Sequence, residues 1–314
     1  MRDLRIVFMG TPDFAVTILK HLVENKYNVV GVITAPDKPA GRGRKLNESA
    51  VKKYATSENL NILQPTNLKN QEFNDELKSL NANLQIVVAF RMLPKSVWAM
   101  PKYGTFNLHA SLLPEYRGAA PINWAIINGE TKTGVTTFFI DDKIDTGEII
   151  QQKETLISSD EIVGQLHDRL MHLGAELVLE TVQLIEKGDV QTTKQPELEE
   201  KSAFKLYPHN CRIDWSKDLS DIYNHIRGLN PYPAAWTTII NNKEEITAKI
   251  YGVSKDYEKH NLETGTIIAT KKELKVAVKE GYLIINEIKL SGKKKMDSKS
   301  LLNGYQFSEE AKAL

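Results

Sequence analysis

The sequence has little of several features that mark common functional classes. Cysteine occurs once in 314 residues, as Cys211, which excludes an internal disulfide framework and a multi-cysteine zinc site. No hydrophobic run approaches the length of a membrane span, and the apolar stretch at residues 6–10 is too short for the core of a signal peptide. We therefore expect a cytoplasmic protein that makes no use of a membrane.

A glycine-rich dinucleotide fingerprint is also missing. The segment after the first predicted strand, residues 9–14, contains the single glycine Gly10 where the fingerprint has three. Without the second and third glycines, a pyrophosphate cannot approach the backbone closely. A bound dinucleotide is therefore not expected.

The charge balance differs between the two parts of the chain. Residues 1–200 contain 22 Lys and Arg against 26 Asp and Glu, whereas residues 201–314 contain 19 against 14. A mildly basic second part permits a polyanionic partner, although an ordinary lysine-rich surface gives the same balance.

Strands and helices alternate through the first 150 residues, which predicts right-handed crossovers and a doubly wound, mostly parallel sheet of the α/β class. The predicted strands are residues 4–9, 28–34, 61–64, 84–90, 104–109 and 134–140, and the predicted helices are residues 14–23, 51–58 and 71–80. A long apolar stripe at helical spacing predicts a packed helix over residues 161–187.

The second part has a different texture, with one helix and several short β-rich runs. The helix is predicted at residues 219–227, and the strands at residues 235–240, 246–253, 266–270, 274–278 and 282–285. Closely spaced short strands are typical of a small barrel of the oligonucleotide-binding (OB) type. We therefore predict a Rossmann-like domain at residues 1–189, a linker at 190–206 and an OB-like domain at 207–314.

Asn107 and His109 lie two residues apart in a predicted strand, so their side chains project from the same face. An amide donor and an imidazole can thus converge on one reacting carbonyl, in the way that acyl transfer requires. A lone histidine in an apolar strand is more often structural. The neighbouring asparagine and the acidic loop that follows favour a functional interpretation here.

The acidic loop contains Asp141, Asp142 and Asp145. Clustered aspartates can bind a divalent cation, but the EF-hand spacing and its terminal glutamate are missing, so we expect no metal site. For Asp142 a solvated turn is the simpler interpretation. Asp145, which precedes Thr146 and Gly147, is better placed to orient an imidazole and to favour its charged form.

The motifs around these residues resemble the signature of formyltransferases that use 10-formyltetrahydrofolate. The similar segments are residues 106–114, residues 117–122 and Asp145-Thr146-Gly147. The resemblance implies that Asn107, His109 and Asp145 are catalytic. It also implies a folate site formed by Phe90, Arg91, Met92, Leu93, Ser111, Leu112, Leu113, Pro114 and Asp141. Phe90-Arg91 departs from the Tyr-Gly that the resemblance leads us to expect.

A basic loop indicates the acceptor substrate. Residues 34–46 are rich in proline and glycine and contain Lys38, Arg42, Arg44 and Lys45, with Lys52 nearby, an arrangement suited to phosphate contacts. On charge alone, a solvated surface loop is the better interpretation. However, the segment is similar to the loop with which tRNA-directed members of the family enter the acceptor stem of the initiator tRNA, and Arg42 occupies the position of their key arginine.

Three segments of the second part, residues 212–215, 226–236 and 301–304, resemble the same tRNA-directed members. The resemblance implies an OB-like domain that binds tRNA, and a monomer that transfers formyl from 10-formyltetrahydrofolate to methionyl initiator tRNA. Two alternatives are a formyltransferase for a small amine, such as a nucleotide-linked amino sugar, and an RNA-binding protein on an inactive scaffold. A small amine does not require the basic loop, and the intact Asn-His-Asp set disfavours an inactive scaffold.

Overall fold

The computed structural model describes residues 1–40, 45–196 and 201–314, and the contacts of the chain divide it into two units. The first unit contains Met1–Gly118, Thr133–Thr155 and His167–Ser202. The second contains Ala119–Lys132, Leu156–Leu166 and Ala203–Leu314. Each unit therefore brings together segments that are far apart in the sequence.

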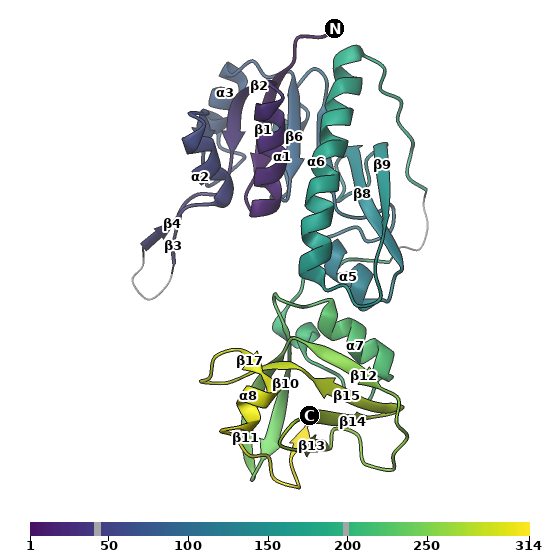
Figure 1. The fold of residues 1–314 in the computed structure, drawn as a ribbon. Coiled ribbons are helices and arrows are strands. Elements are labelled where there is room, and N and C mark those ends of the chain that lie inside the picture. The colour runs from purple at the N-terminus through teal and green to yellow at the C-terminus, as the bar shows by residue number, and fades with distance from the viewer. Residues whose placement is uncertain (41–44, 197–200) are drawn as a thin grey trace. The chain divides into compact units, whose positions relative to one another are not determined.

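A seven-stranded sheet with the order β5-β2-β1-β6-β7-β8-β9 forms the first unit (Figure 1). Its strands are β1 (Arg5–Gly10), β2 (Asn28–Ile33), β5 (Ile62–Leu63), β6 (Leu84–Val88), β7 (Thr105–His109), β8 (Lys132–Phe139) and β9 (Ile149–Leu156). Its helices are α1 (Asp13–Glu24), α2 (Ala50–Ser57), α3 (Gln71–Ser79), α4 (Lys95–Trp98) and most of α6 (Val163–Lys187). The predicted doubly wound α/β class is confirmed.

The pairing of the last strands differs from the prediction in a way that bears on the site. The pairs β2–β5, β1–β2, β1–β6 and β6–β7 are parallel, but β8 runs antiparallel to β7, with Thr136 opposite His109 and Phe139 opposite Phe106. A mostly parallel sheet would place the acidic loop at the same edge as His109, and the antiparallel direction of β8 overturns that expectation. The loop leaves β8 at the other end of β7, so it must fold back to bring Asp145 to His109. The hairpin partner β9 was not predicted, although its buried and exposed residues alternate.

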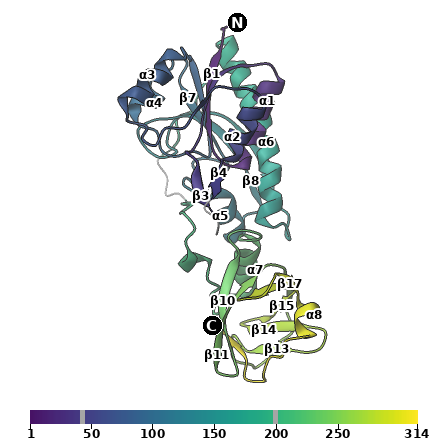
Figure 2. The same ribbon diagram turned by 90° about the vertical axis from the view of Figure 1, so that its left-hand side faces the viewer.

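Helices cover both faces of the sheet, with α3 and α4 on one face and α1 and α6 on the other (Figure 2). On the face of α3 and α4, Val7, Met9 and Val87 of the strands share a core with Phe73 and Leu77 of α3. On the other face, a Cβ added to Gly174 of α6 would lie 2.7 Å from Leu108. Because strand side chains alternate, Asn107 and His109 project from the face opposite to α6.

A short antiparallel hairpin belongs to the first unit, and a short helix that precedes β8 belongs to the second. The hairpin consists of β3 (Lys38–Ala40) and β4 (Lys45–Asn47) and extends away from the sheet (Figure 1). Helix α5 (Pro121–Ile127) belongs to the second unit, in which it packs against α7 (Leu219–Arg227). Among the described helices, none combines the length and apolarity needed to cross a bilayer.

The second unit contains two antiparallel sheets, with the strand orders β17-β16-β11-β10-β18 and β12-β15-β14-β13. The strands are β10 (Ala235–Asn241), β11 (Glu244–Ile250), β12 (Val253–Asp256), β13 (Ile267–Ala269), β14 (Leu274–Val278), β15 (Gly281–Ile285), β16 (Glu287–Leu290), β17 (Met296–Asp297) and β18 (Lys312–Ala313). A 3₁₀ turn, η1 (Pro208–Cys211), and α8 (Ser298–Leu302) accompany them.

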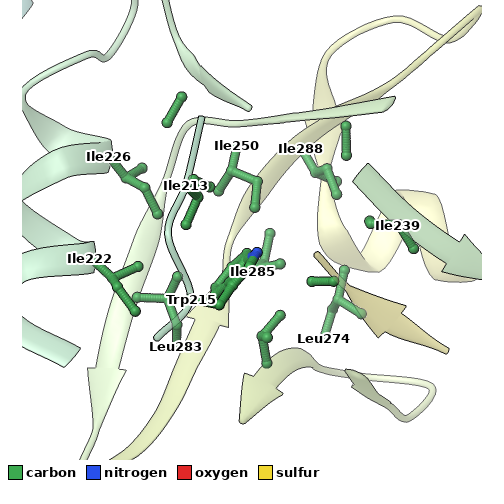
Figure 3. Packing of buried hydrophobic residues seen from close by; sticks show 14 of the residues in the cluster. Ile213, Trp215, Ile222, Ile226, Ile239, Ile250, Leu274, Leu283, Ile285 and Ile288 are labelled. Atoms are coloured by element: carbon green, nitrogen blue, oxygen red, sulfur yellow. The ribbon is translucent and has the colours of Figure 1, made fainter. Parts of the chain in front are cut away.

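Both sheets contribute to one hydrophobic core, shown in Figure 3. Ile250 and Ile288 of one sheet and Leu283 and Ile285 of the other meet around Trp215, and Ile222 and Ile226 of α7 close the core from the helix side. Strands that alternate inward apolar and outward polar residues can build such a core from both sides. The predicted small β domain is confirmed, and the helix predicted at residues 219–227 is α7.

Candidate active site

Strand β7 presents Asn107 and His109 on the face opposite to α6, and the acidic loop brings Asp145 to the imidazole. The distance from His109 Nδ1 to Asp145 Oδ2 is 3.7 Å, and the two side chains are only 7% and 15% exposed. The imidazole and the carboxylate therefore face each other in a part of the site that is largely closed to water. The structure brings together two of the three residues to which the sequence analysis assigned catalysis.

The backbone fixes the other edge of the imidazole. His109 Nε2 lies 2.9 Å from the carbonyl oxygen of Tyr116, and because a carbonyl only accepts, Nε2 must carry the hydrogen. Tyr116 has a φ of +61°, a left-handed conformation that turns its carbonyl toward the ring. Nδ1 is therefore the ring nitrogen that faces the Asp145 carboxylate.

Asn107 is half-buried, and among the described residues its carboxamide forms no hydrogen bond. It projects from the same face of β7 as His109, two residues away. A polar group on a rigid strand without a protein partner is available to a ligand. Asn107 can therefore donate an N–H to an oxygen held near His109.

The turn that contains Asp145 is held by a set of local contacts. Asp145 has a φ of +56°, and its Oδ2 accepts a hydrogen bond of 3.0 Å from the backbone N–H of Gly118. A Cβ on Gly147 would lie 1.6 Å from the carbonyl oxygen of Phe139, so only glycine allows this close approach. Within the Asp-Thr-Gly sequence, packing therefore requires Gly147, whereas the chemical role is expected of Asp145.

Asp141 stabilises the same loop from within. Its Oδ1 accepts hydrogen bonds from the Thr146 hydroxyl at 2.8 Å and from the Lys143 N–H at 3.0 Å. Asp142 is exposed, as expected for a solvated turn, and lies 3.9 Å from the Lys95 ammonium. No group of three or more potential metal ligands occurs in the parts of the chain that the structure describes.

The segment from Ser111 to Pro114, expected to border the folate, is anchored to β8 and β9. Ser111 and Leu113 are almost fully buried, at 0% and 3% exposed. Thr136 donates to the carbonyl of Ser111 at 2.7 Å and accepts from the N–H of Leu113, while Gln152 donates to the carbonyl of Leu113 at 2.9 Å. The buried side chains fix the main chain of the segment, and Leu112 and Pro114 are the half-buried members.

The second segment expected at the folate, residues 90–93, follows β6. Met92 is 67% exposed, whereas Leu93 is 8% exposed and packs in the core beneath the half-buried Phe90. Arg91 donates to the carbonyl of Thr66 at 2.9 Å and to that of Pro65, and its guanidinium lies 5.5 Å from the centre of the Phe90 ring. In place of the expected Tyr-Gly, this chain has Phe90-Arg91, and the arginine links residues 90–93 to the loop at residues 65 and 66.

The hairpin expected to contact tRNA is only partly described. Lys38 is exposed at its start, whereas Arg42, Arg44 and the side chain of Lys45 lie outside the described residues. Lys52, counted with these cations in the sequence analysis, pairs instead with Asp37 and, at 3.0 Å, with Glu48. The hydrogen bonds from Lys52 and Gln64 lower the pKa of Asp37, so the carboxylate anchors the root of the hairpin.

The chain has a single cysteine, and its thiol is buried. Cys211 belongs to the second unit, where it is 3% exposed in the hydrophobic core. Burial raises the pKa of the Cys211 thiol, which disfavours the thiolate that a nucleophile requires.

Several residues of the site were missed by the sequence analysis. Gln195 bonds both the Asp145 turn and Arg117, and Thr136 and Gln152 hold the main chain at Ser111 and Leu113. Gln195 stands in the polar stretch that we expected to be a linker. Arg117 was included in the signature segment at residues 117–122 without a role of its own. No local pattern marks Gln195, Thr136 or Gln152, because their roles depend on strands and loops distant in the sequence.

Comparison with known families matches both parts of the chain. The formyl transferase family model matches residues 4–182, and the model of the formyl transferase C-terminal domain matches residues 205–306. A protein named methionyl-tRNA formyltransferase from Flavobacterium johnsoniae is 60% identical over 99% of both chains. One of the same name from Bacteroides thetaiotaomicron is 52% identical over 98% of this chain and 97% of its own.

Solved structures agree at the level of the fold. The N-formyltransferase from Helicobacter canadensis, in complex with folinic acid and dTDP-3-aminofucose, has a TM-score of 0.66 at 22% identity and covers 93% of this chain and 100% of its own. HypX from Aquifex aeolicus, in complex with tetrahydrofolic acid, has a TM-score of 0.64 at 17% identity and covers 96% of this chain and 47% of its own. With both domain models matched and near-complete coverage by relatives of one name, the chain belongs to the formyl transferase family and, within it, to the methionyl-tRNA formyltransferases.

Proposed function

We propose that this chain transfers a formyl group from 10-formyltetrahydrofolate to the α-amine of methionyl initiator tRNA. The observation that carries the proposal is the His109–Asp145 pair beside an Asn107 carboxamide with no protein partner among the described residues. The relatives named methionyl-tRNA formyltransferase, 52–60% identical over nearly the whole chain, support the choice of acceptor.

Asn107 stabilises the charge that develops during the reaction. As the neutral amine attacks the formyl carbon, negative charge develops on the formyl oxygen, and the Asn107 carboxamide donates to that oxygen. Removing one donor of this kind typically raises the barrier by about 2.7–4 kcal/mol. Asn107→Ala should therefore lower kcat about 100- to 1,000-fold.

His109 acts from its Nδ1 edge, because Nε2 is engaged with the carbonyl of Tyr116. With Nε2 engaged, the protonated ring donates from Nδ1 to the developing oxyanion. The bond between the formyl carbon and N10 of the folate then breaks, and the proton lost by the amine passes through a water held by Asp145 to N10 of the leaving tetrahydrofolate. Asp145 orients the ring and stabilises positive charge on it. No covalent enzyme intermediate is required, since the amine itself is the nucleophile.

When bound, 10-formyltetrahydrofolate supplies the formyl group. We assign its binding to Phe90, Arg91, Met92, Leu93, Ser111, Leu112, Leu113, Pro114 and Asp141. The fit is supported by the half-buried Phe90 and the 67% exposed Met92, which offer apolar surface to a planar ring. Ser111 and Leu113 contribute through the main chain that they fix, since their side chains are buried.

We assign tRNA binding to Lys38, Arg42, Arg44 and Lys45 of the basic hairpin and to the OB-like domain at residues 207–314. The exposure of Lys38 and the anchoring of the hairpin root by Asp37 and Lys52 support this part of the proposal. We also propose that the protein is a cytoplasmic monomer that uses neither a metal nor a membrane.

The test is formylation of charged initiator tRNA by the purified protein, with and without 10-formyltetrahydrofolate, and with charged elongator tRNA as the control. Folate-dependent product on the initiator alone is the expected result. If no product forms although the folate binds, the acceptor is wrong and small amines become the candidates. Near wild-type turnover by folded His109→Ala or Asn107→Ala would overturn the residue roles.

A further inference from the structure

Gln195 connects the Asp145 turn to Arg117. Its side chain is 6% exposed, and Nε2 donates to the carbonyl oxygens of Asp145 at 2.9 Å and Gly147 at 2.7 Å. Its Oε1 accepts from Nε and Nη2 of Arg117 at 3.1 and 2.6 Å. Only one orientation of the carboxamide satisfies these contacts, because the guanidinium can only donate and the carbonyls can only accept.

The neighbours of Arg117 hold the two groups that we assign to catalysis. The carbonyl of Tyr116 accepts from the His109 ring at 2.9 Å, and the N–H of Gly118 donates to the Asp145 carboxylate at 3.0 Å. Three consecutive residues thus bind the imidazole, the Gln195 carboxamide and the carboxylate. Through Arg117, Gln195 is coupled to the same stretch of main chain that sets the position of both side chains.

The Asp145 turn needs such external support. The φ of Asp145, +56°, is a left-handed conformation that residues with a side chain rarely adopt. Because β8 runs antiparallel to β7, the turn also has to fold back from the far end of β7 to reach His109. Gln195 bonds the carbonyls on both sides of Thr146, so it fixes the main chain at the point where the turn approaches the imidazole.

The segment around Gln195 is itself anchored to the sheet unit. Thr193 exchanges two backbone hydrogen bonds with Ile149 of β9, at 2.8 and 2.9 Å, and the Thr192 hydroxyl donates to Glu148. Gln195 is therefore presented from an ordered support rather than from a free linker.

We propose that Gln195 is a positioning residue for formyl transfer, which holds the Asp145 carboxylate beside His109 and does not touch the substrates. The inference rests on the proposed function of the site. It predicts that loss of the Gln195 N–H donors slows the chemical step and leaves substrate binding nearly unchanged, because a catalytic group displaced by about 1 Å can cost about 100-fold in rate.

The experiment compares Gln195→Met and Gln195→Glu with the wild type in formylation of methionyl initiator tRNA. Glutamate can still pair with Arg117 but offers no N–H to the two carbonyls, so both variants should lower kcat about 10- to 100-fold. The KM values for tRNA and folate should stay within about twofold. Gln85→Met is the matched control, since Gln85 is also buried, at 1% exposed, and accepts from Thr105 at the opposite end of β7 from His109.

A double-mutant cycle separates positioning from a general loss of structure. If Gln195 acts through Asp145, Gln195→Met should cost less than about twofold in the Asp145→Asn background, measured by single turnover with excess enzyme. The same fold loss in both backgrounds, or wild-type kcat in a folded Gln195→Met or Gln195→Glu protein, overturns the positioning role alone. Absence of formylation by the wild type overturns the proposed function as well.

Discussion

Tyr223 contributes to the unfolding free energy of the second unit, and this contribution should be lost at alkaline pH. The side chain is 7% exposed on α7, and its hydroxyl donates to Asp160 Oδ1 at 2.9 Å. Burial, followed by the bond to Asp160, raises the pKa of Tyr223 from 10.0 to about 12. A phenol that loses its proton in this position would place a second negative charge beside a carboxylate.

The sign and size of the effect follow from proton linkage. The folded state binds the phenol proton more tightly than the unfolded state, so the contribution is fully present below about pH 10 and is lost as the pH rises to about 12. A difference of about two pKa units corresponds to about 2.7 kcal/mol of unfolding free energy. At pH 11, about half of this, roughly 1.4 kcal/mol, should be gone.

Urea unfolding followed by tryptophan fluorescence measures this directly, since Trp124, Trp215 and Trp236 all belong to the second unit. The free-energy difference between the wild type and Tyr223→Phe, which cancels other titrating groups, should shrink by about 1.4 kcal/mol from pH 9 to pH 11. Tyr232 is 83% exposed and serves as the control. The free-energy difference between the wild type and Tyr232→Phe should change by less than about 0.5 kcal/mol over the same pH range. A difference for Tyr223→Phe that stays constant over this range would refute the reasoning.

Three further predictions concern other contacts. Arg227→Met should destabilise the second unit by about 2–4 kcal/mol in the same urea assay. Arg227 is 6% exposed, and removal of its guanidinium leaves the main-chain carbonyls of Ser158 and Glu161 without their donor; a change below about 0.5 kcal/mol would contradict this. Gly147→Ala should lower kcat by about 100-fold or more, since its Cβ would lie 1.6 Å from the carbonyl oxygen of Phe139; wild-type turnover would show that the turn adapts. Lys38→Ala and Arg42→Ala should weaken tRNA binding and reduce its salt dependence by about one phosphate contact each, with folate binding intact; an equal loss of folate affinity would count against an RNA contact.

Features that depend on neighbouring residues were predicted correctly from the sequence. The helix predicted at residues 219–227 is α7, with the bounds Leu219–Arg227, because its apolar spacing and its core-facing residues coincide. The two-residue alternation of β7 likewise placed Asn107 and His109 on one face. The opposite contact, Leu108 against Gly174 of α6, supports that assignment.

The direction of the strands could not be predicted from the sequence. A short apolar run gives the same pattern in a parallel and an antiparallel neighbour, so the direction of β8 was not readable from its residues. The ion pair of Lys52 could not be predicted from the sequence either, because its partner Asp37 lies 15 residues away along the chain. Counting charges along the sequence therefore grouped Lys52, which pairs with Asp37, with the cations of the basic loop.

The sequence by itself determined the α/β class, the small β domain, and the faces from which Asn107 and His109 project, because side-chain alternation and apolar periodicity are properties of neighbouring residues. Only the tertiary structure brought Asp145 back along an antiparallel strand to the imidazole, turned the carbonyl of Tyr116 to one ring nitrogen, and set Gln195 against the catalytic turn. Those contacts join residues up to 50 positions apart, and their geometry depends on how the sheet is paired, which no local pattern encodes.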